Sequence, residues 1–297
     1  MEARYKSLSI FEFQERFPDE RSCYAYLAKL KWQRGFKCKH CGHSRYCSGN
    51  QEFDRQCTSC HYVESVTAGT LFHKMKFSIL KAFWIVYYVS TSKKGIASTE
   101  LSRKLQLRQK TAWLFKQKVM RAMKSSGNQP LEGDVDVDEF VVGQQEEGST
   151  GRQKGQKKLV AIAIEKHGER GASRMYAKEI GKASSSELAP FVREKVSPTA
   201  SLRTDAWPAY NCLKHEFQNF TQVLSGDKGK NFNTIHRVIM GFKAWLRGIH
   251  SHADHLQAYL DEYAYRYNRS FMKEGIFDNL LNRMVQGVPY GSKQIIS

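Results

Sequence analysis

The sequence predicts an α/β protein in which helices flank a mixed β-sheet, preceded by a small cysteine-rich module and a helical region. Four cysteines stand in two close pairs near the start, and helical apolar spacing dominates as far as about residue 126. Beyond residue 130 the pattern changes to alternating and continuous apolar strands, including one strand–helix–strand succession. We therefore expect three regions, at residues 1–66, 67–126 and 130–297.

The composition limits the class of protein and its partners. The chain has 297 residues and a formal net charge of +18, with 47 Lys and Arg against 29 Asp and Glu. Such an excess favours a polyanionic partner, although ribosomal and membrane-surface proteins share it. We expect no membrane segment, because no run of eighteen apolar residues occurs, and no signal peptide, because the N-terminus lacks that pattern. Three cysteines outside the two pairs, an odd number, suit a reducing compartment, so we expect a cytoplasmic, nucleoid-associated protein.

The N-terminal region combines helices with a metal site. Residues 8–32 have helical apolar spacing and lead into two C-x2-C pairs separated by fifteen residues. That spacing predicts a zinc ribbon, in which four thiolates complete the tetrahedral shell of a structural Zn²⁺. The alternative is four unrelated buried thiols, and the neighbouring histidines are expected at the surface. The predicted ligands are Cys38, Cys41, Cys57 and Cys60.

The next region, residues 67–126, is predicted to be helical. Residues 77–90 are apolar enough for a largely buried helix, and two shorter helices follow at 96–104 and 109–124 around a turn near 106–108. Two short helices joined by a tight turn, the second rich in Lys and Arg, are typical of a helix-turn-helix, although any helical hairpin looks similar. We expect three basic residues here to contact DNA: Arg108, Lys110 and Lys116.

The third region predicts a sheet. Residues 134–142 alternate, 159–164 form an apolar run, and 174–180 are a third strand, which suggests an antiparallel meander. A helix at 185–196 and a strand from Ser201 to Asp205 then make a parallel crossover. After one more strand near 221–224, helices are expected at 233–249 and 255–267.

Two carboxylates of this plan can converge. If a central strand carries Asp138 and the neighbouring parallel strand ends at Asp205, their side chains meet at one edge of the sheet. A pair of Asp side chains is a sufficient protein contribution to a Mg²⁺ site, which keeps positions for water and phosphate. The alternative is that Asp134, Asp136 and Asp138 form one solvent-exposed strand face.

Six motifs follow one another along the chain. They are FPDE at 17–20, KTAW at 110–113, VDVDEF at 135–140, RTDAWPAY at 203–210, FKAWLRGIH at 242–250 and LQAYLDEYAYRYNR at 256–269. Together they resemble a group of bacterial insertion-sequence transposases related to the eukaryotic Merlin elements, and the resemblance covers nearly the whole chain. It implies an RNase H-like fold and a DDE-type catalytic domain at 130–297, preceded by a zinc ribbon within 1–66 and a helix-turn-helix within 67–126.

By position, Asp138 resembles the first catalytic Asp of this group and Asp205 the second. The third carboxylate of the pattern lies seven residues before a basic residue, and His236 takes that place ahead of Lys243. Imidazole suits Mn²⁺ better than Mg²⁺, and a plain surface histidine is the alternative. Asn233 or Glu262 are the other residues that could supply the third ligand.

The resemblance implies a transposase that binds the terminal inverted repeats of its element and performs metal-dependent strand cleavage and transfer. Lys243 and Arg247 lie four apart and are expected to hold phosphates, with a solvated basic stripe as the alternative. The expected partners are double-stranded DNA at the element ends and target, and further copies of the chain. The competing functions are a catalytically inactive DNA-binding regulator and a zinc-ribbon RNA-processing factor.

Overall fold

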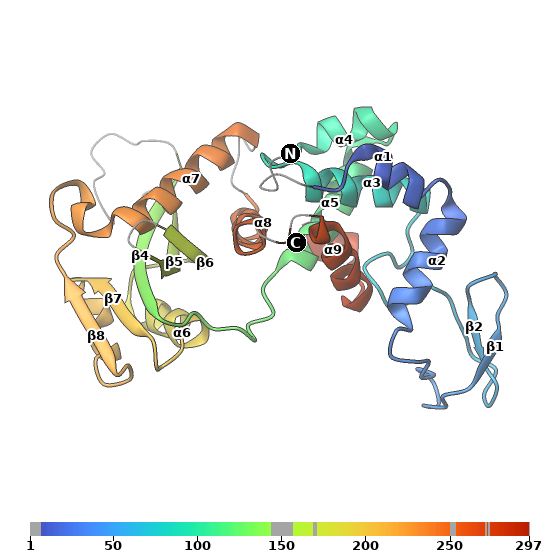
Figure 1. Ribbon diagram of the computed structural model, residues 1–297, viewed down its shortest axis with the longest axis horizontal. Coiled ribbons are helices and arrows are strands. Elements are labelled where there is room, and N and C mark those ends of the chain that lie inside the picture. The colour runs from blue at the N-terminus through green and yellow to red at the C-terminus, as the bar shows by residue number, and fades with distance from the viewer. Residues whose placement is uncertain are drawn as a thin grey trace. The chain divides into compact units, whose positions relative to one another are not determined.

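The structure is a computed structural model that describes residues 7–143, 157–168, 171–249, 254–270, 272 and 274–296. The chain forms two compact units, Met1–Met123 with Met272–Ser297, and Lys124–Phe271. Most of their helices and strands are labelled in Figure 1. The first is helical with a small sheet, and the second is built around a larger sheet.

The first unit begins with two helices where the sequence showed one stretch of helical spacing. They are α1 (Ile10–Arg16) and α2 (Glu20–Lys31). The break falls at Phe17, because a residue before proline is disfavoured in helical conformation and Asp19 then starts a new helix. Capping boxes at Ser9 and Asp19 bond the first free backbone amides of each helix.

A small antiparallel sheet follows, of order β1-β2-β3. Its strands are β1 (Tyr46–Ser48), β2 (Arg55–Cys57) and β3 (Val63–Glu64). A buried ionic cluster joins this sheet to α2, because the ammonium groups of Lys31 and Lys39 lie 2.8 and 2.9 Å from the Glu64 carboxylate. Glu64 is only 1% exposed, so these two cations compensate a charge that would otherwise be costly to bury.

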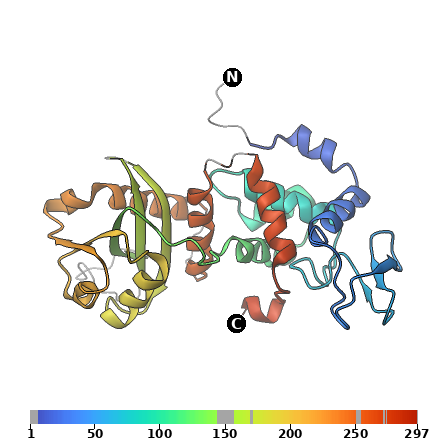
Figure 2. The same cartoon turned by 60° about the horizontal axis from the view of Figure 1, so that its bottom comes forward.

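The rest of the first unit is helical: α3 (Ile79–Thr91), α4 (Ser98–Leu105), α5 (Gln109–Met123), α9 (Gly275–Gln286) and α10 (Ser292–Ile296). Helix α9 packs against α2, α3 and α5, and Figure 2 shows this red helix among them. Its buried Phe277 ring contacts Phe13, Phe17 and Phe83. Residues from 272 onward thus belong with the helical unit, whereas the sequence-based boundary placed them in the sheet domain. Their apolar face is completed by aromatic rings from the N-terminal helices.

The second unit contains a five-stranded sheet of order β6-β5-β4-β7-β8. Strands β4, β5 and β6 pair antiparallel, while β7 and β8 run parallel to β4 on its other side. This arrangement is that of the RNase H-like folds, as the sequence predicted. The strands are β4 (Asp134–Val142), β5 (Lys158–His167), β6 (Gly171–Ile180), β7 (Ser201–Asp205) and β8 (Asn219–Val223).

Helices cover both faces of this sheet (Figure 1). Alternate residues of β4, Val135 and Val137, enter a core with α6 (Ser185–Lys195). The opposite face of β4 meets α7 (Asn233–Ile249), where the rings of Phe140 and Phe242 lie 5.9 Å apart. A residue's position along β4 therefore decides which helix it faces, as the two-residue period of a strand requires.

Helix α8 (Leu256–Asn268) covers the outer edge of β6 with side-chain amides. The Asn268 amide accepts a hydrogen bond from the Met175 N–H at 2.8 Å and donates to the Met175 carbonyl at 2.9 Å. Gln257 makes the same kind of pair with the Glu179 N–H and the Ala177 carbonyl. Backbone groups that would be unpaired on an edge strand are satisfied in this way.

Candidate active site and metal centres

The structure brings the two predicted aspartates together. Strand β7 pairs parallel to β4 with Asp136 opposite Arg203 and Val137 opposite Thr204, so Asp138 and Asp205 come next along the two strands. Carboxylate oxygens of Asp138, Asp205 and Glu139 all lie within 4.8 Å of one another. The alternative, in which Asp136 and Asp138 lie on a solvent-exposed face of the strand, is wrong, because Asp136 is only 1% exposed.

Asp205 is held where its strand ends. It is the last residue of β7 and 7% exposed, and its Oδ1 accepts a hydrogen bond of 3.1 Å from the Trp207 N–H. The Trp207 indole donates to the Ala183 carbonyl at 2.9 Å and fixes the chain as it leaves the sheet. Trp207, two residues after Asp205, thus shapes the strand exit.

Glu139 is the site residue that the sequence analysis missed. A strand's alternation puts it on the face opposite Asp138, among the residues that face α6. Strand β7 ends beside Asp138, however, so β4 has no parallel neighbour beyond that point. The Glu139 carboxylate therefore lies at the same edge of the sheet as those of Asp138 and Asp205. The buried Tyr210 hydroxyl donates a 2.7 Å hydrogen bond to Glu139 Oε2. The only signal in the sequence was that Glu139 lies inside the motif VDVDEF with Asp138, and Tyr210 inside the motif RTDAWPAY with Asp205.

His236 lies beside the carboxylates, in the first turn of α7. Its Nε2 is 3.3 Å from Asp138 Oδ2. This hydrogen bond, opposed by partial burial, raises the pKa of His236 above its ordinary value. Gly229, in the 3₁₀ turn η3 (Asp227–Phe232), has φ +73°, and a Cβ there would lie 1.7 Å from His236 Cε1. Only glycine leaves room for the imidazole at this place.

The two other residues considered for the third position lie elsewhere. Asn233 is exposed at the start of α7. Glu262 is fully buried in α8, where its Oε1 accepts hydrogen bonds of 3.0 and 2.7 Å from Arg266. Helix α8 packs on β6, which is two strands away from β4. Glu262 is therefore not a ligand of the cluster, because it forms an ion pair with Arg266 at the β6 edge of the sheet.

The basic residues of α7 differ in their surroundings. Lys243 is partly buried, with its ammonium 5.5 Å from the centre of the Phe140 ring. Burial first, and then the charges of Arg247 and Lys157, lower the pKa of Lys243. Arg247 is exposed one turn later. Phosphate binding by this pair stays a prediction.

One of the three residues expected to contact DNA was wrongly assigned. Helices α4 and α5 form the predicted pair, joined by a turn with Gln106 at φ +50°, and Arg108 and Lys110 are exposed at the start of α5. Lys116 is 3% exposed, and its ammonium donates a 2.7 Å hydrogen bond to the Ile96 carbonyl. It faces the segment between α3 and α4 because it lies six residues after Lys110, on a different side of the helix. Lys116 therefore stabilises the helix pair, while DNA binding by the other two stays a prediction.

The four predicted zinc ligands converge. Their sulfur atoms lie within 4.8 Å of one another, with Cys38 and Cys60 sulfurs 3.6 Å apart and those of Cys41 and Cys57 also 3.6 Å apart. Zn–S bonds of about 2.3 Å in a tetrahedron require sulfur separations of about 3.8 Å, so the residues fit Zn²⁺. Hydrogen bonds from backbone amides, above all that of Cys60, lower the pKa of the Cys57 thiol to about 7 and favour its thiolate.

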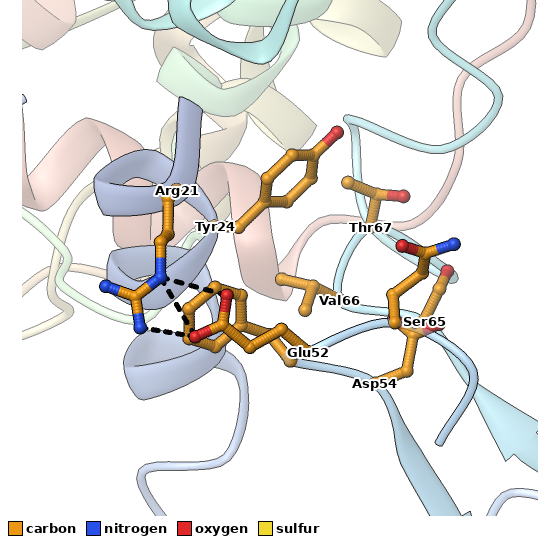
Figure 3. Close-up of a pocket in the computed structure, with 9 residues that line it drawn as sticks. Arg21, Tyr24, Glu52, Asp54, Ser65, Val66 and Thr67 are labelled. Atoms are coloured by element: carbon orange, nitrogen blue, oxygen red, sulfur yellow. Dashed lines mark hydrogen bonds and ion pairs between the residues drawn. The ribbon is translucent and has the colours of Figure 1, made fainter. Parts of the chain in front are cut away.

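A cavity of about 400 Å³ lies between α2, the β1–β2 turn and the segment after β3. In Figure 3 the Arg21 guanidinium bonds the Glu52 carboxylate across one side, with Tyr24 and Val66 beside it. Glu52 neutralises Arg21 and Asp54 adds a further negative charge, so the cavity does not have the basic lining of a phosphate site.

No helix in the described part of the chain is long and apolar enough to cross a membrane. No curated protein matches the chain significantly. A solved structure entitled "Crystal structure of a pre-cleavage Mos1 transpososome" is similar at 11% identity over 70% of this chain and 79% of that chain, with a TM-score of 0.29.

Two family models match the chain. The ISXO2-like transposase domain matches residues 130–268, which include the acidic cluster and His236, and the transposase zinc-ribbon domain matches residues 18–63, which include the four cysteines. The two matches together span more than half of the chain, in the order that the motifs predicted. The chain therefore contains a region similar to the ISXO2-like transposase domain, preceded by one similar to the transposase zinc-ribbon domain.

Proposed function

We propose that this protein is the DNA transposase of an insertion sequence, which binds the terminal inverted repeats of its element and catalyses metal-dependent strand cleavage and strand transfer. The observation that carries the proposal is the meeting of Asp138 and Asp205 on parallel neighbouring strands of an RNase H-like sheet. The match of residues 130–268 to the ISXO2-like transposase domain supports it.

The acidic cluster fits a divalent cation of the Mg²⁺ or Mn²⁺ type. Its carboxylate oxygens come from three side chains within 4.8 Å of one another, and oxygen is the ligand that both ions accept. Such ions, when bound, activate a water or a 3′ hydroxyl and stabilise the leaving oxygen of an in-line displacement at phosphorus. Asp138 and Asp205 would hold the ion, and Glu139 adds the third carboxylate.

The neighbouring residues have separate roles in this proposal. His236 offers a ring nitrogen to the site or orients Asp138 through their 3.3 Å contact. Lys243 and Arg247 hold phosphates next to the scissile bond, as charge and position on α7 allow. The Tyr210 hydroxyl keeps Glu139 turned toward the edge of the sheet.

End recognition falls to the first unit. The zinc ribbon and the α4–α5 pair, with Arg108 and Lys110 exposed at the start of α5, would contact the repeat, so affinity should fall steeply with salt. Joining two element ends requires at least two copies of the chain in one DNA complex. The alternative function is an inactive, transposase-derived regulator that binds the same DNA without cutting it.

The deciding experiment is cleavage of a labelled duplex that carries the element's own end, in Mg²⁺ and separately in Mn²⁺. Wild type should cut at the repeat boundary, while Asp138→Asn and Asp205→Asn should bind the duplex without cutting it. Asp134→Asn is the matched control, because this exposed aspartate lies on the same strand outside the cluster. A preference for Mn²⁺ supports His236 as a ligand. Binding without cleavage by zinc-loaded wild type in both metals would move the function to the regulator.

A further inference from the structure

Asp136 is a buried carboxylate that the proposed chemistry does not use. It is 1% exposed and sits on β4, two residues before Asp138. Arg203, on β7 and two residues before Asp205, donates two hydrogen bonds to it: Nε to Oδ1 at 2.8 Å and Nη2 to Oδ2 at 2.7 Å. This two-point contact fixes both distance and orientation between the two strands.

The ion pair lies one step along the sheet from the acidic cluster. Asp136 and Arg203 are directly paired in the parallel register, and residues two apart on a strand share a face. Asp138 and Asp205 therefore follow on the same face, about 7 Å farther along at about 3.3 Å per residue. A slip of one residue between β4 and β7 would turn one aspartate to the other face and break this pair at the same time.

Arg203 also reaches the segment that carries His236. Its guanidinium lies 4.7 Å from the centre of the Phe232 ring, which is 2% exposed. Phe232 ends η3 and is directly followed by α7, whose first turn contains His236. The Arg203 side chain, which belongs to β7, thus contacts both β4 and the residue just before α7. The strands β4 and β7 and the helix α7 each supply at least one residue of the site.

We propose that the Asp136–Arg203 pair is a positioning element that sets the geometry in which Asp138, Asp205 and His236 bind a divalent metal ion. The proposal rests on the proposed function in taking the acidic cluster as a metal site. Arg203 directs two of its N–H groups to Asp136, and both Asp136 oxygens accept from it, so we assign neither side chain to phosphate or metal binding. The pair acts through the residues it aligns.

The same sheet contains a matched pair with no such neighbours. Arg174 on β6 donates to Glu165 on β5, with the closest contact at 2.5 Å, and both side chains are partly buried like that of Arg203. This pair lies on the antiparallel side of β4. Loss of the Arg174 pair should cost stability without changing the metal site, whereas loss of the Arg203 pair should change both.

The test measures Mn²⁺ binding by electron paramagnetic resonance on full-length zinc-loaded protein, without DNA. Arg203→Gln alone would leave the Asp136 charge buried without its partner, so it is replaced by two variants designed to fold. Arg203→Lys keeps the charge but not the two-point contact, and the double variant Asp136→Asn with Arg203→Gln removes both charges. We expect both to bind Mn²⁺ about 10- to 100-fold more weakly than wild type, the range seen when outer-shell partners of metal ligands are removed.

Two further readouts separate positioning from stability. Melting temperature should fall for Arg174→Gln while its Mn²⁺ affinity stays at the wild-type value. In cleavage assays, Arg203→Lys should need more Mn²⁺ for half-maximal rate while its rate at saturating Mn²⁺ stays near wild type. Folded Arg203→Lys and double variants with unchanged Mn²⁺ affinity would overturn the positioning role, as would a wild type that binds no Mn²⁺. Wild type that binds Mn²⁺ at Asp138 but does not cut DNA contradicts only the proposed function.

Discussion

The two candidate metal sites of this protein are assembled in opposite ways. The four cysteines lie within one short segment, and two knuckles and a hairpin bring their sulfurs together. Asp138 and Asp205 are far apart along the chain and meet only because β4 and β7 run side by side. The cysteine site is local, so its segment depends on the metal to fold. The aspartate site is built by the sheet, so it is formed before any metal binds.

The largest expected effect follows from this difference. Cys57→Ser should release zinc and unfold residues 38–64, because a structural zinc contributes about 10 to 16 kcal/mol in comparable small modules. The sheet unit should keep its Mn²⁺ affinity, since its ligands are placed by strand pairing. Zinc content, limited proteolysis and Mn²⁺ titration measure the three outcomes.

Cys47→Ser is the control for that experiment, because this exposed cysteine lies in the same ribbon outside the ligand set. If removal of zinc by itself abolished Mn²⁺ binding, the two metal sites would not be independent, which would contradict the comparison.

Glu139→Gln tests whether the carboxylate that the sequence analysis missed belongs to the metal site. We expect Mn²⁺ binding about 10- to 100-fold weaker, with a smaller loss in Tyr210→Phe, which removes only the hydroxyl that orients Glu139. Glu132→Gln, an exposed position just before β4, is the control. Unchanged affinity in Glu139→Gln would leave Asp138 and Asp205 as the whole carboxylate site.

Gly229→Ala tests the placement of His236. The new Cβ would overlap the imidazole and would hold φ at +73°, which costs a non-glycine residue about 1 to 2 kcal/mol. Strand cleavage should fall and the melting temperature should drop. In a His236→Ala background the same change should still lower stability but no longer affect cleavage, and an undiminished effect on cleavage there would mean that Gly229 acts by another route.

The smallest effect concerns acid stability of the sheet. Burial alone would raise the pKa of Glu165, but hydrogen bonds from Arg174, the Glu132 N–H and Ser173 outweigh it and hold the pKa below its ordinary value of 4.5. The pair therefore stabilises the folded state above pH 4.5, and this contribution is lost as the pH falls through the lowered pKa. Melting curves of wild type and Glu165→Gln should differ at pH 7 and converge toward pH 3. A constant difference across that range would contradict the shift.

Much of the fold was predictable because the patterns are local. The strands of the second unit and the crossover between β6 and β7 were expected within a few residues of where they lie. The C-terminal boundary was not, because α9 is an ordinary amphipathic helix whose partners are aromatic rings near the start of the chain. The prediction for Lys116 was wrong for a similar reason, since the sequence gives no sign that a basic residue on a helix will bond the Ile96 carbonyl in the segment before α4.

The sequence by itself predicted the zinc ribbon, the succession of strands along the chain and the two aspartates of the site, Asp138 and Asp205. It could do so because ligand spacing and strand periodicity are properties of short segments. Only the tertiary structure showed what each carboxylate of β4 contacts. Asp136 pairs with Arg203, Asp138 lies beside His236, and Glu139 lies at the same edge of the sheet as Asp138 because β7 ends there. Those assignments depend on register and strand length between segments far apart in the chain, and no single segment contains that information.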